Sequence, residues 1–432
     1  MTNTLAFNVA LMGARMHYAV PRLFHQHGAL ARFYADICAT QGWPRALRLL
    51  PSRCLPAAVQ RLAGRVPQGI PPRLVLAFTR FGLEYQRRRS QARSISEMTA
   101  AHLWAGATFG QLVLEAEPAQ STDLYCFNSA SLELLRAWRG RGRLSMVEQT
   151  IAPRRIEEQI VSQEHLTFPG WQEPLPQDAN VEAYMEREEE EWRHADVIVC
   201  GSEFVRQGVH ACGGPRERCV VVPYGIDLHG CFAGQRAELA GRPLRVLTVG
   251  EVGLRKGTPY VLEAARQLAG RVQVRMAGPM ALLPERADEL RRHVEWVGIV
   301  PRREIAAHYL WADVFLLPSL CEGSATVTYE ALGAGLPVIA TASTGSIIEP
   351  NVSGFCVAEG DASEIVSVLE KFLEDPQLLK VMSVEARRRA KQGGLTAYGE
   401  RLMSTARAAQ ANLLGVPKDR ATVVESGKFR RA

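Results

Sequence analysis

The stretch CEGSATVTYEALGAGLPVIATASTG, residues 321–345, contains a loop, a helical segment, a glycine turn and an apolar run in succession. The apolar run before it predicts a strand over Phe315–Pro318, with Ser319–Gly323 as its loop and a helix beginning near Ser324. The run LPVIATA after the glycine turn predicts the next strand. A strand, a helix and a strand in this order are typical of parallel strands in an α/β fold.

The same alternation extends through most of the chain, in two units separated by a glycine-containing segment at Asp227–Arg242 that we interpret as a linker. The second unit begins at Leu244–Val249 and continues through VQVRMAG, VEWVGIV, ADVFLLPS, LPVIATA and GFCVAEG. In the first unit, strands are predicted at Leu5–Leu11, Leu30–Ile37, Asp123–Asn128, Leu144–Thr150, Val197–Cys200 and Cys219–Pro223, with helices over Arg15–Gly28 and Glu97–Glu115. Two α/β domains with largely parallel sheets are therefore expected.

Two segments of the first unit interrupt the alternation. Residues 42–93 contain several prolines and are interpreted as an insertion, in which LVLAFTRFGLEY has the spacing of an amphipathic helix. Residues 152–180 are rich in Pro and Gln and are predicted to be a loop.

Composition narrows the class of protein. The chain has 432 residues, of which 47% are hydrophobic and 22% charged, which indicates a folded globular protein. No apolar run reaches the length of a membrane span, and the N-terminus lacks the pattern of a secretory signal. The nine cysteines form no CxxC pairs or zinc-type spacing. We interpret them as thiols of a cytoplasmic protein.

Charge is distributed unevenly along the chain. Residues 1–96 contain 14 arginines and only two acidic residues, although the whole chain carries a net charge of +6. Such a region can bind an anionic membrane, a nucleic acid or an anionic ligand, or it can be a solvated arginine-rich face. Nucleic acid is not expected, because no nucleic-acid-binding motif accompanies the charge.

The loop before the helix has the features of a phosphate site. The N–H groups of Ser324, Ala325 and Thr326 are expected to be free at the helix N-terminus and to point toward a diphosphate. Gly323 is expected to let the backbone approach an oxygen of that group. Glu330, two turns into the helix, is suited to accept hydrogen bonds from ribose hydroxyls, and Glu322 is placed near the hydroxyls of a donor sugar.

A second motif, VGEVGLRKG, follows the strand Leu244–Val249. The strand ends at Gly250, which is expected to bind the donor, and Arg255 and Lys256 precede the next predicted helix. Two cations at the carboxyl end of a strand can neutralise phosphates, Arg through paired hydrogen bonds and Lys as a point charge.

The segments VGEVGLRKG, VEWVGIV, ADVFLLPS and CEGSATVTYEALGAGLPVIATASTG resemble the donor domain of GT-B fold retaining glycosyltransferases of family 4, the glycosyl transferases group 1. HADVIVCGSEFV and VVPYGID resemble the end of the family's first domain. The resemblance implies two Rossmann-like domains with parallel sheets facing an interdomain cleft. It also implies a nucleotide-diphosphate sugar as donor, retention of configuration, and no cofactor or metal.

The family's glutamate pair corresponds to Glu322 and Glu330, and its phosphate-binding cations to Arg255 and Lys256. We class Glu322, Arg255 and Lys256 as the catalytic residues, with Glu322 positioning the sugar and not acting as a general base. The strand end that contacts the nucleobase corresponds to Val297–Val300, with Val297 and Ile299 as the residues concerned.

The chain departs from the family in its first half. The family's diglycine turn is Gly13-Ala14 here, and the position of its usual histidine holds Cys126 to Asn128. Asn128 is expected to donate a hydrogen bond to the sugar in place of that histidine, and Glu148 to face the cleft beside it. His17 is a further candidate on the acceptor side, as are His102 and His165.

The resemblance also assigns roles to the domains. Residues 1–228 are expected to bind the acceptor and 229–393 the donor. The helix 394–415 is expected to pack back on the first domain, and 416–432 to form a mobile tail.

The predicted function is transfer of a hexose-type sugar from a UDP- or GDP-sugar to a glycan or lipid-linked acceptor in cell-surface polysaccharide or glycolipid synthesis. Basic residues 15–93 are expected to hold the protein at the inner face of a membrane. Two alternatives remain open: a non-catalytic subunit that binds nucleotide-sugar as a scaffold or regulator, and a sugar-nucleotide epimerase.

Overall fold

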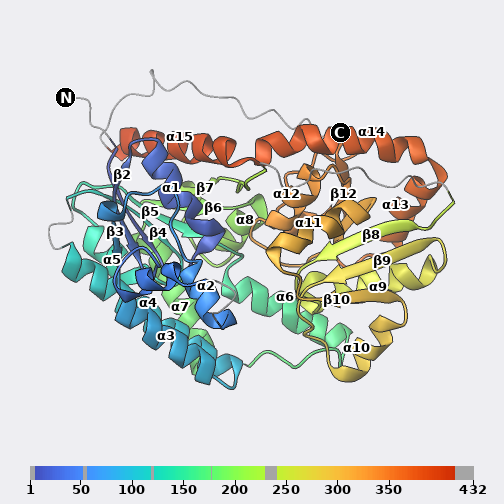
Figure 1. Cartoon of the computed structure of the whole chain (residues 1–432), viewed down its shortest axis with the longest axis horizontal. Coiled ribbons are helices and arrows are strands. Elements are labelled where there is room, and N and C mark those ends of the chain that lie inside the picture. The colour runs from blue at the N-terminus through green and yellow to red at the C-terminus, as the bar shows by residue number, and fades with distance from the viewer. Residues whose placement is uncertain (1–4, 52–55, 118–120, 177, 229–240, 414–432) are drawn as a thin grey trace.

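The computed structural model describes residues 5–51, 56–117, 121–176, 178–228 and 241–413. Two lobes lie side by side, each built on its own sheet (Figure 1). The greater part of the predicted linker and the whole of the predicted tail 416–432 lie outside the described residues.

The first lobe, called the first domain below, contains a seven-stranded sheet in the order β3-β2-β1-β4-β5-β6-β7. Every pairing is parallel. Its strands are β1 Phe7–Leu11, β2 Leu30–Ala35, β3 Val75–Ala77, β4 Asp123–Phe127, β5 Ser145–Gln149, β6 Val197–Cys200 and β7 Cys219–Val221. Because the strand order reverses between β1 and β4, the carboxyl ends of these two strands border the crevice where open α/β sheets bind ligands.

Helices cover both faces of this sheet, because the central strands are apolar on both sides. From β1, Phe7 and Val9 pack toward one face together with α1, while Ala10 packs toward the other with α4 and α5. The helices of this domain are α1 Ala19–Gln26, α2 Ala57–Ala63, α3 Thr79–Gln91, α4 Ile95–Ala116, α5 Leu132–Trp138, α6 Arg154–Thr167, α7 Ala179–His194 and α8 Glu203–Ala211.

The second domain has a six-stranded sheet in the order β10-β9-β8-β11-β12-β13, again with parallel pairings. Its strands are β8 Leu244–Val249, β9 Val272–Ala277, β10 Val294–Gly298, β11 Val314–Leu317, β12 Val338–Thr341 and β13 Gly354–Val357. The helices are α9 Thr258–Gln267, α10 Pro284–Arg291, α11 Arg302–Trp311, α12 Thr326–Gly333, α13 Ala362–Glu374 and α14 Pro376–Ala390. The last described helix, α15 Leu395–Leu413, returns to the first domain, where Tyr398 and Leu402 join the core beside α1.

The predicted loop at 152–180 is wrong, since Arg154–Thr167 forms α6. This helix runs from the first lobe toward the second (Figure 1), and Trp171, just beyond it, belongs to the core of the second domain. The Tyr260 hydroxyl of α9 donates to both carboxylate oxygens of Glu164, at 3.0 Å each. The first domain therefore reaches the second through α6 as well as through the linker.

Two local predictions also need correction. The segment LVLAFTRFGLEY is not one helix: Val75–Ala77 forms the edge strand β3, and α3 begins only at Thr79. The expected helix from Arg15 begins instead as a short 3-10 turn, η1, Arg15–Tyr18, in which Met16, His17 and Tyr18 all have positive φ. Each L-residue in this left-handed backbone conformation costs roughly 1–2 kcal/mol of conformational free energy, so the turn is strained.

Candidate active site

The predicted cations and the predicted glutamate meet at the carboxyl ends of two neighbouring strands. β8 and β11 pair in parallel, so the segments that follow them lie at the same edge of the sheet. Arg255 and Lys256 lie in a 3-10 turn after β8, and Glu322 lies in the loop after β11. Oε1 of Glu322 accepts a hydrogen bond from Nη1 of Arg255 at 2.9 Å and forms an ion pair with the Lys256 ammonium.

The three charged groups are largely removed from solvent. Lys256 is 7% exposed and Glu322 8% exposed. Burial lowers the pKa of Lys256, and the adjacent Glu322 carboxylate acts in the opposite direction. Buried cations held by a carboxylate in this way can bind an anionic ligand through charge-assisted hydrogen bonds.

Glycines allow the two loops to approach each other. Gly257, directly after Lys256, has φ +71°, and a Cβ there would lie 2.2 Å from the carbonyl oxygen of Pro318 at the end of β11. Gly250, predicted to bind the donor, also has positive φ, and a Cβ there would lie 3.3 Å from the Lys256 side chain. These glycines set the position of the cations, and a direct contact of Gly250 with a donor stays a prediction.

The expectation for the helix N-terminus is partly wrong. Helix α12 begins at Thr326, and the N–H of Ala325 donates to the carbonyl oxygen of Thr344 at 3.1 Å, so it is not free for a ligand. The hydroxyl of Ser324 lies 2.6 Å from that of Tyr329 and serves packing within the domain. Phosphate contacts through the N–H groups of Ser324 and Thr326 stay predictions.

Gly323 has a structural role that the sequence did not reveal. A Cβ at this position would lie 2.3 Å from the carbonyl oxygen of Thr150 and 3.0 Å from Cα of Ile151. Both of these residues belong to the segment between β5 and α6. The residue is therefore small because the first domain packs directly against it. Its approach to an oxygen of a diphosphate stays a prediction.

Glu330 lies on α12 with its carboxylate bound to a neighbouring helix. The Tyr309 hydroxyl of α11 donates to Oε2 of Glu330 at 2.8 Å. Burial raises the pKa of Glu330, while the hydrogen bond from Tyr309 and the charge of Arg302 lower it. One carboxylate oxygen is thus positioned by Tyr309, and an interaction of Glu330 with a ribose stays a prediction.

The first domain faces this region with its strained turn. Gly13 has φ +83°, and the N–H of His17 donates to the carbonyl oxygen of Ala14 at 3.0 Å. Burial lowers the pKa of His17, and the charge of Arg302 from α11 lowers it further. The charge of Arg302 therefore acts on both His17 and Glu330. The acceptor-side roles of Gly13, Ala14 and His17 stay predictions.

Asn128 has structural partners on both ends of its amide. Nδ2 donates to Glu188 at 2.8 Å, and Oδ1 accepts from the Thr150 hydroxyl at 2.8 Å and its N–H at 3.2 Å. The side chain is 8% exposed. Asn128 thus ties the end of β4 to β5 and α7, an arrangement that does not favour the predicted hydrogen bond to a sugar.

Glu148 does not face the cleft as predicted. It is fully buried, accepts from the Tyr125 hydroxyl at 2.6 Å and lies 3.5 Å from Nε of Arg15. The Arg15 guanidinium in turn donates to the Tyr224 hydroxyl at 2.8 Å and to the carbonyl oxygen of Thr150 at 3.0 Å. The carboxylate anchors Arg15, which holds the loop before η1 against the end of β5.

The nucleobase side of the second domain is formed around the end of β10. The N–H of Gly278 donates to the carbonyl oxygen of Gly298 at 2.8 Å, which joins the ends of β9 and β10. Val297 is half-buried, whereas Ile299, just past the strand, is 77% exposed. An exposed apolar side chain beside a strand end can contact a base, and this role stays a prediction for both residues.

Sequence reasoning missed Glu157. Its Oε1 lies 3.5 Å from Nε of Arg255, and its Oε2 accepts from Arg154 at 3.1 Å. Glu157 belongs to α6, which had been assigned to a loop. The spacing of Ile156, Ile160 and Val161 was the signal that could have revealed the helix. Through this residue the first domain contributes a carboxylate to the cation site.

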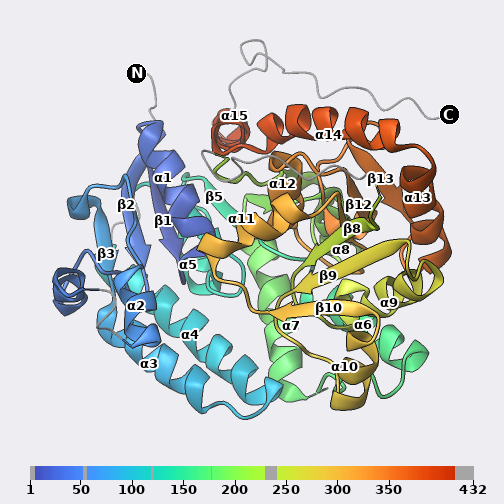
Figure 2. The same cartoon turned by 45° about the vertical axis from the view of Figure 1, so that its right-hand side comes forward.

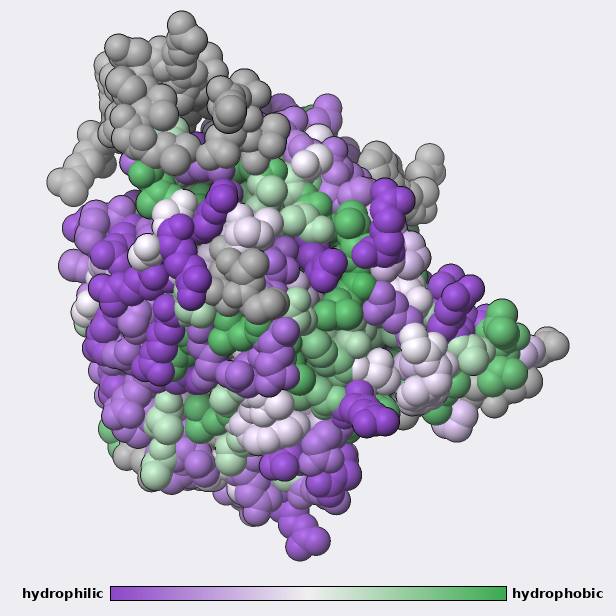
Figure 3. All heavy atoms as spheres, turned by 90° about the vertical axis from the view of Figure 1, so that its left-hand side faces the viewer, coloured by the Kyte–Doolittle hydropathy of each residue, from purple (hydrophilic) through white to green (hydrophobic). Residues whose placement is uncertain are grey.

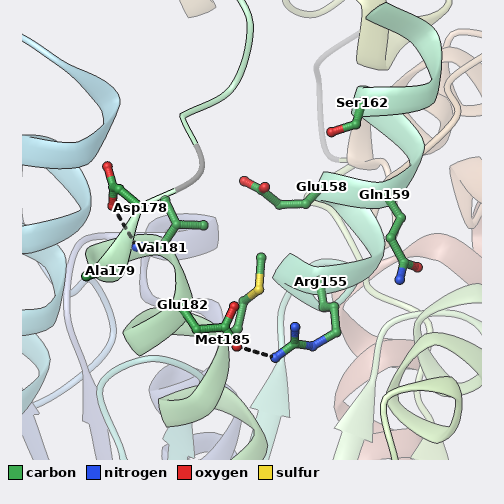
Figure 4. Close-up of a pocket in the computed structure, with 9 residues that line it drawn as sticks. All are labelled: Arg155, Glu158, Gln159, Ser162, Asp178, Ala179, Val181, Glu182 and Met185. Carbon is green, nitrogen blue, oxygen red and sulfur yellow. Dashed lines mark hydrogen bonds and ion pairs between the residues drawn. The ribbon is translucent and has the colours of Figure 1, made fainter. Parts of the chain in front are cut away.

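Two hollows lie beside α6 and α7. A hollow of about 530 Å³ is lined by residues of both helices, and a second of about 210 Å³ lies toward the cation site. In the larger one, Glu158 and Ser162 point from α6 toward α7, and Arg155 reaches across to Glu182 (Figure 4). His102 lines the smaller hollow, and the hydroxyl-bearing Thr99 lies beside it. His165, on the last turn of α6, lines neither of these two hollows.

The sequence is similar to those of known glycosyltransferases. Residues 235–389 match the family model of glycosyl transferases group 1. The chain is 29% identical over 219 residues to a colanic acid biosynthesis glycosyltransferase, WcaL, of Salmonella typhimurium, covering 46% of this chain and 53% of that protein. It is 34% identical over 175 residues to the amylovoran biosynthesis glycosyltransferase AmsK of Erwinia amylovora, covering 37% of this chain and 43% of that protein. The matched segments thus span about half the length of these relatives.

Solved structures resemble the chain over nearly its whole length. The Anabaena protein HepE in complex with UDP and glucose has a TM-score of 0.58 at 15% identity, covering 94% of this chain and 100% of that one. The sucrose-phosphate synthase of Thermosynechococcus elongatus has a TM-score of 0.63 at 15% identity, with the same coverage. The chain therefore has the GT-B fold, and the predicted fold class is confirmed.

Proposed function

We propose that this protein is a retaining glycosyltransferase that moves a hexose-type sugar from a UDP- or GDP-sugar to a glycan or lipid-linked acceptor. The observation that carries the proposal is the group formed by Arg255, Lys256 and Glu322. Two cations meet the carboxylate of Glu322 there, at the edge of the sheet where open α/β folds bind their ligands, and Glu157 of α6 pairs with Arg255. The match of residues 235–389 to a glycosyltransferase family model supports it independently.

In the proposed complex, the diphosphate lies against Arg255 and Lys256, near the N-terminus of α12. Its charge replaces part of the pairing that Glu322 provides, which leaves that carboxylate available for sugar hydroxyls. Buried cations placed where negative charge develops stabilise a leaving diphosphate more strongly than exposed ones would. Glu322 then orients the sugar, and it is not assigned a proton-transfer step.

Transfer with retention is proposed to occur on one face of the sugar. The bond from the anomeric carbon to the diphosphate oxygen breaks, and a bond to the acceptor oxygen forms on the same side. The acceptor proton passes to the departing phosphate oxygen, so no protein nucleophile is needed. The residues of the chain contribute positioning and charge stabilisation.

The names of the relatives guide the choice of donor and product. HepE is described with UDP and glucose, and WcaL and AmsK are named for polysaccharide synthesis. We therefore propose a role in cell-surface polysaccharide or glycolipid synthesis, with UDP and GDP as the two nucleotides to test. No metal or other cofactor is proposed to take part.

We also propose that the protein associates peripherally with an anionic membrane surface. The 3-10 segment η2, Trp43–Leu49, projects from the left edge of the molecule in Figure 2. Trp43 is 54% exposed and Leu49 85% exposed, and Arg45 and Arg48 beside them are exposed as well. Apolar side chains flanked by arginines suit the boundary between headgroups and acyl chains.

Apolar side chains gather in more than one place on the face shown in Figure 3. Hydrophilic residues cover most of its left part, hydrophobic residues lie across its middle, and a separate hydrophobic area lies on a protrusion at the right. In the described part of the chain, no helix is long and apolar enough to cross a membrane. Attachment through η2 at the cytoplasmic face is the arrangement that we propose.

The donor proposal is tested by thermal unfolding with millimolar UDP, GDP and ADP, using the wild type and the variants Lys256→Ala and Glu330→Ala. A nucleotide present at about 100 times its dissociation constant stabilises the folded state by roughly 2.7 kcal/mol. Stabilisation of the wild type alone supports the site. Stabilisation of all three proteins, or of none even with intact nucleotide-sugars, contradicts it.

The same samples separate the two alternatives. A non-catalytic subunit would bind a nucleotide-sugar without releasing nucleotide in the presence of any acceptor. An epimerase would convert the donor sugar with no acceptor present. Product analysis of each nucleotide-sugar after incubation, with and without acceptor, distinguishes these outcomes from transfer.

A further inference from the structure

A small hollow lies in the first domain between α4, α6 and α7. Its volume is about 210 Å³, below the roughly 300–1,000 Å³ of pockets that enclose drug-sized ligands. Its size suits one sugar residue. The lining residues are Thr99 and His102 of α4, Ile151, Ala152, Arg154 and Glu157 around the start of α6, and Tyr184 and Glu188 of α7.

This hollow lies next to the proposed donor site. Its lining residue Glu157 is the one that pairs with Arg255, with 3.5 Å between Oε1 and Nε. Ile151, also in the lining, packs against Gly323, where an added Cβ would lie 3.0 Å from Cα of Ile151. Ile151 therefore lies between the hollow and the loop that carries Glu322.

The lining favours a neutral polyol. His102 supplies a ring that can donate or accept a hydrogen bond, and burial together with the charges of Arg89 and Arg154 lowers its pKa, which favours the uncharged imidazole. Thr99 of α4 and Tyr184 of α7 also line the hollow and carry hydroxyl groups. The Thr99 hydroxyl donates to the carbonyl oxygen of Ile95 at 2.9 Å, and Tyr184 has a hydrogen bond with Ser129. A hydroxyl with one partner can still form a second hydrogen bond with a sugar hydroxyl.

Charge in the hollow disfavours an anionic sugar. The guanidinium of Arg154 is already bound to two carboxylates, those of Glu157 at 3.1 Å and Glu158 at 2.8 Å. A carboxylate brought in by the ligand would meet Glu157 with no uncommitted cation among the lining residues. Two neighbouring carboxylates repel each other strongly where water is largely excluded.

A larger hollow of about 530 Å³ also lies between α6 and α7. Most of its lining residues are further toward the C-terminus of α6 and further toward the N-terminus of α7 than those of the small hollow. Glu158 and Ser162 point into the space between the helices, and Met185 lies between them (Figure 4). The two hollows share no lining residue, and the larger one is not part of the binding site proposed below.

We propose that the hollow between α4, α6 and α7 binds the terminal residue of a neutral glycan acceptor, with His102 and Tyr184 as positioning residues. The proposal rests on the glycosyltransferase function proposed above. It adds the class of acceptor, a neutral hexose end group.

The test uses the full chain and the nucleotide-sugar whose nucleotide stabilises it. The acceptor probes are p-nitrophenyl glucoside, galactoside and mannoside, with p-nitrophenyl glucuronide as the charged counterpart. Nucleotide release is measured with and without each probe, for the wild type, His102→Ala, His102→Gln and Tyr184→Phe. His293→Ala is the matched control, because His293 is exposed in the second domain.

At least one neutral hexoside should accelerate nucleotide release by the wild type, and the glucuronide should be much less effective. His102→Ala should raise the KM for that hexoside about tenfold, the effect of one lost hydrogen bond, with an unchanged KM for the donor. His102→Gln should recover most of the loss, and His293→Ala should behave as the wild type. If the melting curve shows that His102→Ala is poorly folded, Tyr184→Phe replaces it, and its KM for the hexoside is compared with its KM for the donor in the same way.

The proposal is overturned if the donor binds normally but no neutral hexoside accelerates release, or if the glucuronide is equally effective. It is also overturned if the variants slow release to water and to the hexoside equally, because that marks a structural effect. Failure of every nucleotide-sugar to stabilise the wild type overturns the proposed function itself, and this outcome is recognisable before any acceptor is added.

Discussion

A β-carbon on Gly323 would lie 2.3 Å from the carbonyl oxygen of Thr150, so the two domains meet at this point without room for a side chain. The same carbonyl accepts a hydrogen bond from Arg15 at 3.0 Å. Gly323 follows Glu322 directly, so this contact also fixes how near the carboxylate lies to the first domain. The glycine therefore couples domain packing to the geometry of the proposed donor site.

Replacing Gly323 with alanine should reduce stability, because the carbonyl of Thr150 belongs to a fixed backbone and must move. Overpacking of this kind typically costs about 1–3 kcal/mol. The control is Gly394→Ala: Gly394 has φ −76°, and the nearest atom to an added Cβ, the carbonyl oxygen of Lys391, lies at 3.4 Å. Urea unfolding of both variants checks the prediction, and equal midpoints would contradict it.

Substitution of Glu322 by glutamine should separate nucleotide binding from transfer. The carboxylate shares Arg255 and Lys256 with the proposed diphosphate, so its neutralisation should leave UDP or GDP binding intact or tighter. Transfer should fall by about 10²–10³, the usual effect of losing one group that acts at the reacting centre. Glu374→Gln is the control, since Glu374 is exposed at the end of α13.

Calorimetric titration with nucleotide and a rate assay with the nucleotide-sugar decide the Glu322 prediction. A variant that no longer binds nucleotide but is folded would show that Glu322 holds the cations in place. In that case its proposed role toward the sugar would have to be abandoned.

The affinity for nucleotide should depend on pH through Glu330. Burial raises the pKa of this carboxyl, so it gains its proton at a higher pH than an exposed glutamate does as the pH falls. The ionised form accepts hydrogen bonds from a ribose, so affinity should weaken on acidification before exposed carboxylates titrate. The stability of the fold depends on pH in the opposite direction. At a pH above the raised folded-state pKa, burial of the ionised carboxylate destabilises the protein, and this cost decreases as the pH falls and is absent below the unfolded-state pKa.

Dissociation constants measured between about pH 8 and pH 5 for the wild type and Glu330→Gln check this dependence. The glutamine variant should bind more weakly at pH 8 and show a flatter profile. His17→Gln serves as a second control, because the charge of Arg302 also acts on His17 and lowers its pKa. A wild-type profile that is flat, or one abolished by the His17 variant alone, would refute the assignment to Glu330.

Asn128 should matter for stability more than for the chemistry of transfer. Its amide pairs with Glu188 and Thr150, so Asn128→Ala leaves a buried carboxylate with one partner fewer. The loss of such a partner costs about 1–3 kcal/mol. Thermal unfolding should show a clearly lowered midpoint. An unchanged midpoint with a large loss of transfer would instead favour the sugar contact expected from the sequence.

The second domain could be predicted almost entirely from the sequence, because its strands are short apolar runs and its charged motifs follow them directly. Leu244–Val249 is a strand with the predicted bounds, and parallel pairing of β8 with β11 brings Lys256 to Glu322. In this case local patterns and the rules of parallel sheets determine the positions of the site residues.

The first domain was harder to predict because its site residues are satisfied by long-range contacts. Glu148 is held by Arg15 and Tyr125, and no local pattern signals that three such residues will meet. Helix α6 was missed because Pro and Gln flanking it suggested a loop, although Pro153 directly precedes its first turn. The reason for Gly323 could not be predicted either, since it depends on how the two domains pack.

The proposed membrane contact can be tested separately from catalysis, because η2 lies outside the cation site. Wild-type protein should float with vesicles that contain anionic phosphatidylglycerol and should bind less at high salt, since exposed charges are then screened. Trp43→Ser combined with Leu49→Ser should weaken flotation about tenfold or more, because each buried apolar side chain contributes roughly 1.5–3 kcal/mol when fully transferred. The matched control replaces Val381 and Val384 of α14 with serine, which are 51% and 62% exposed. Equal loss in the control, or equal binding to neutral vesicles, would show that η2 and its arginines do not provide the attachment.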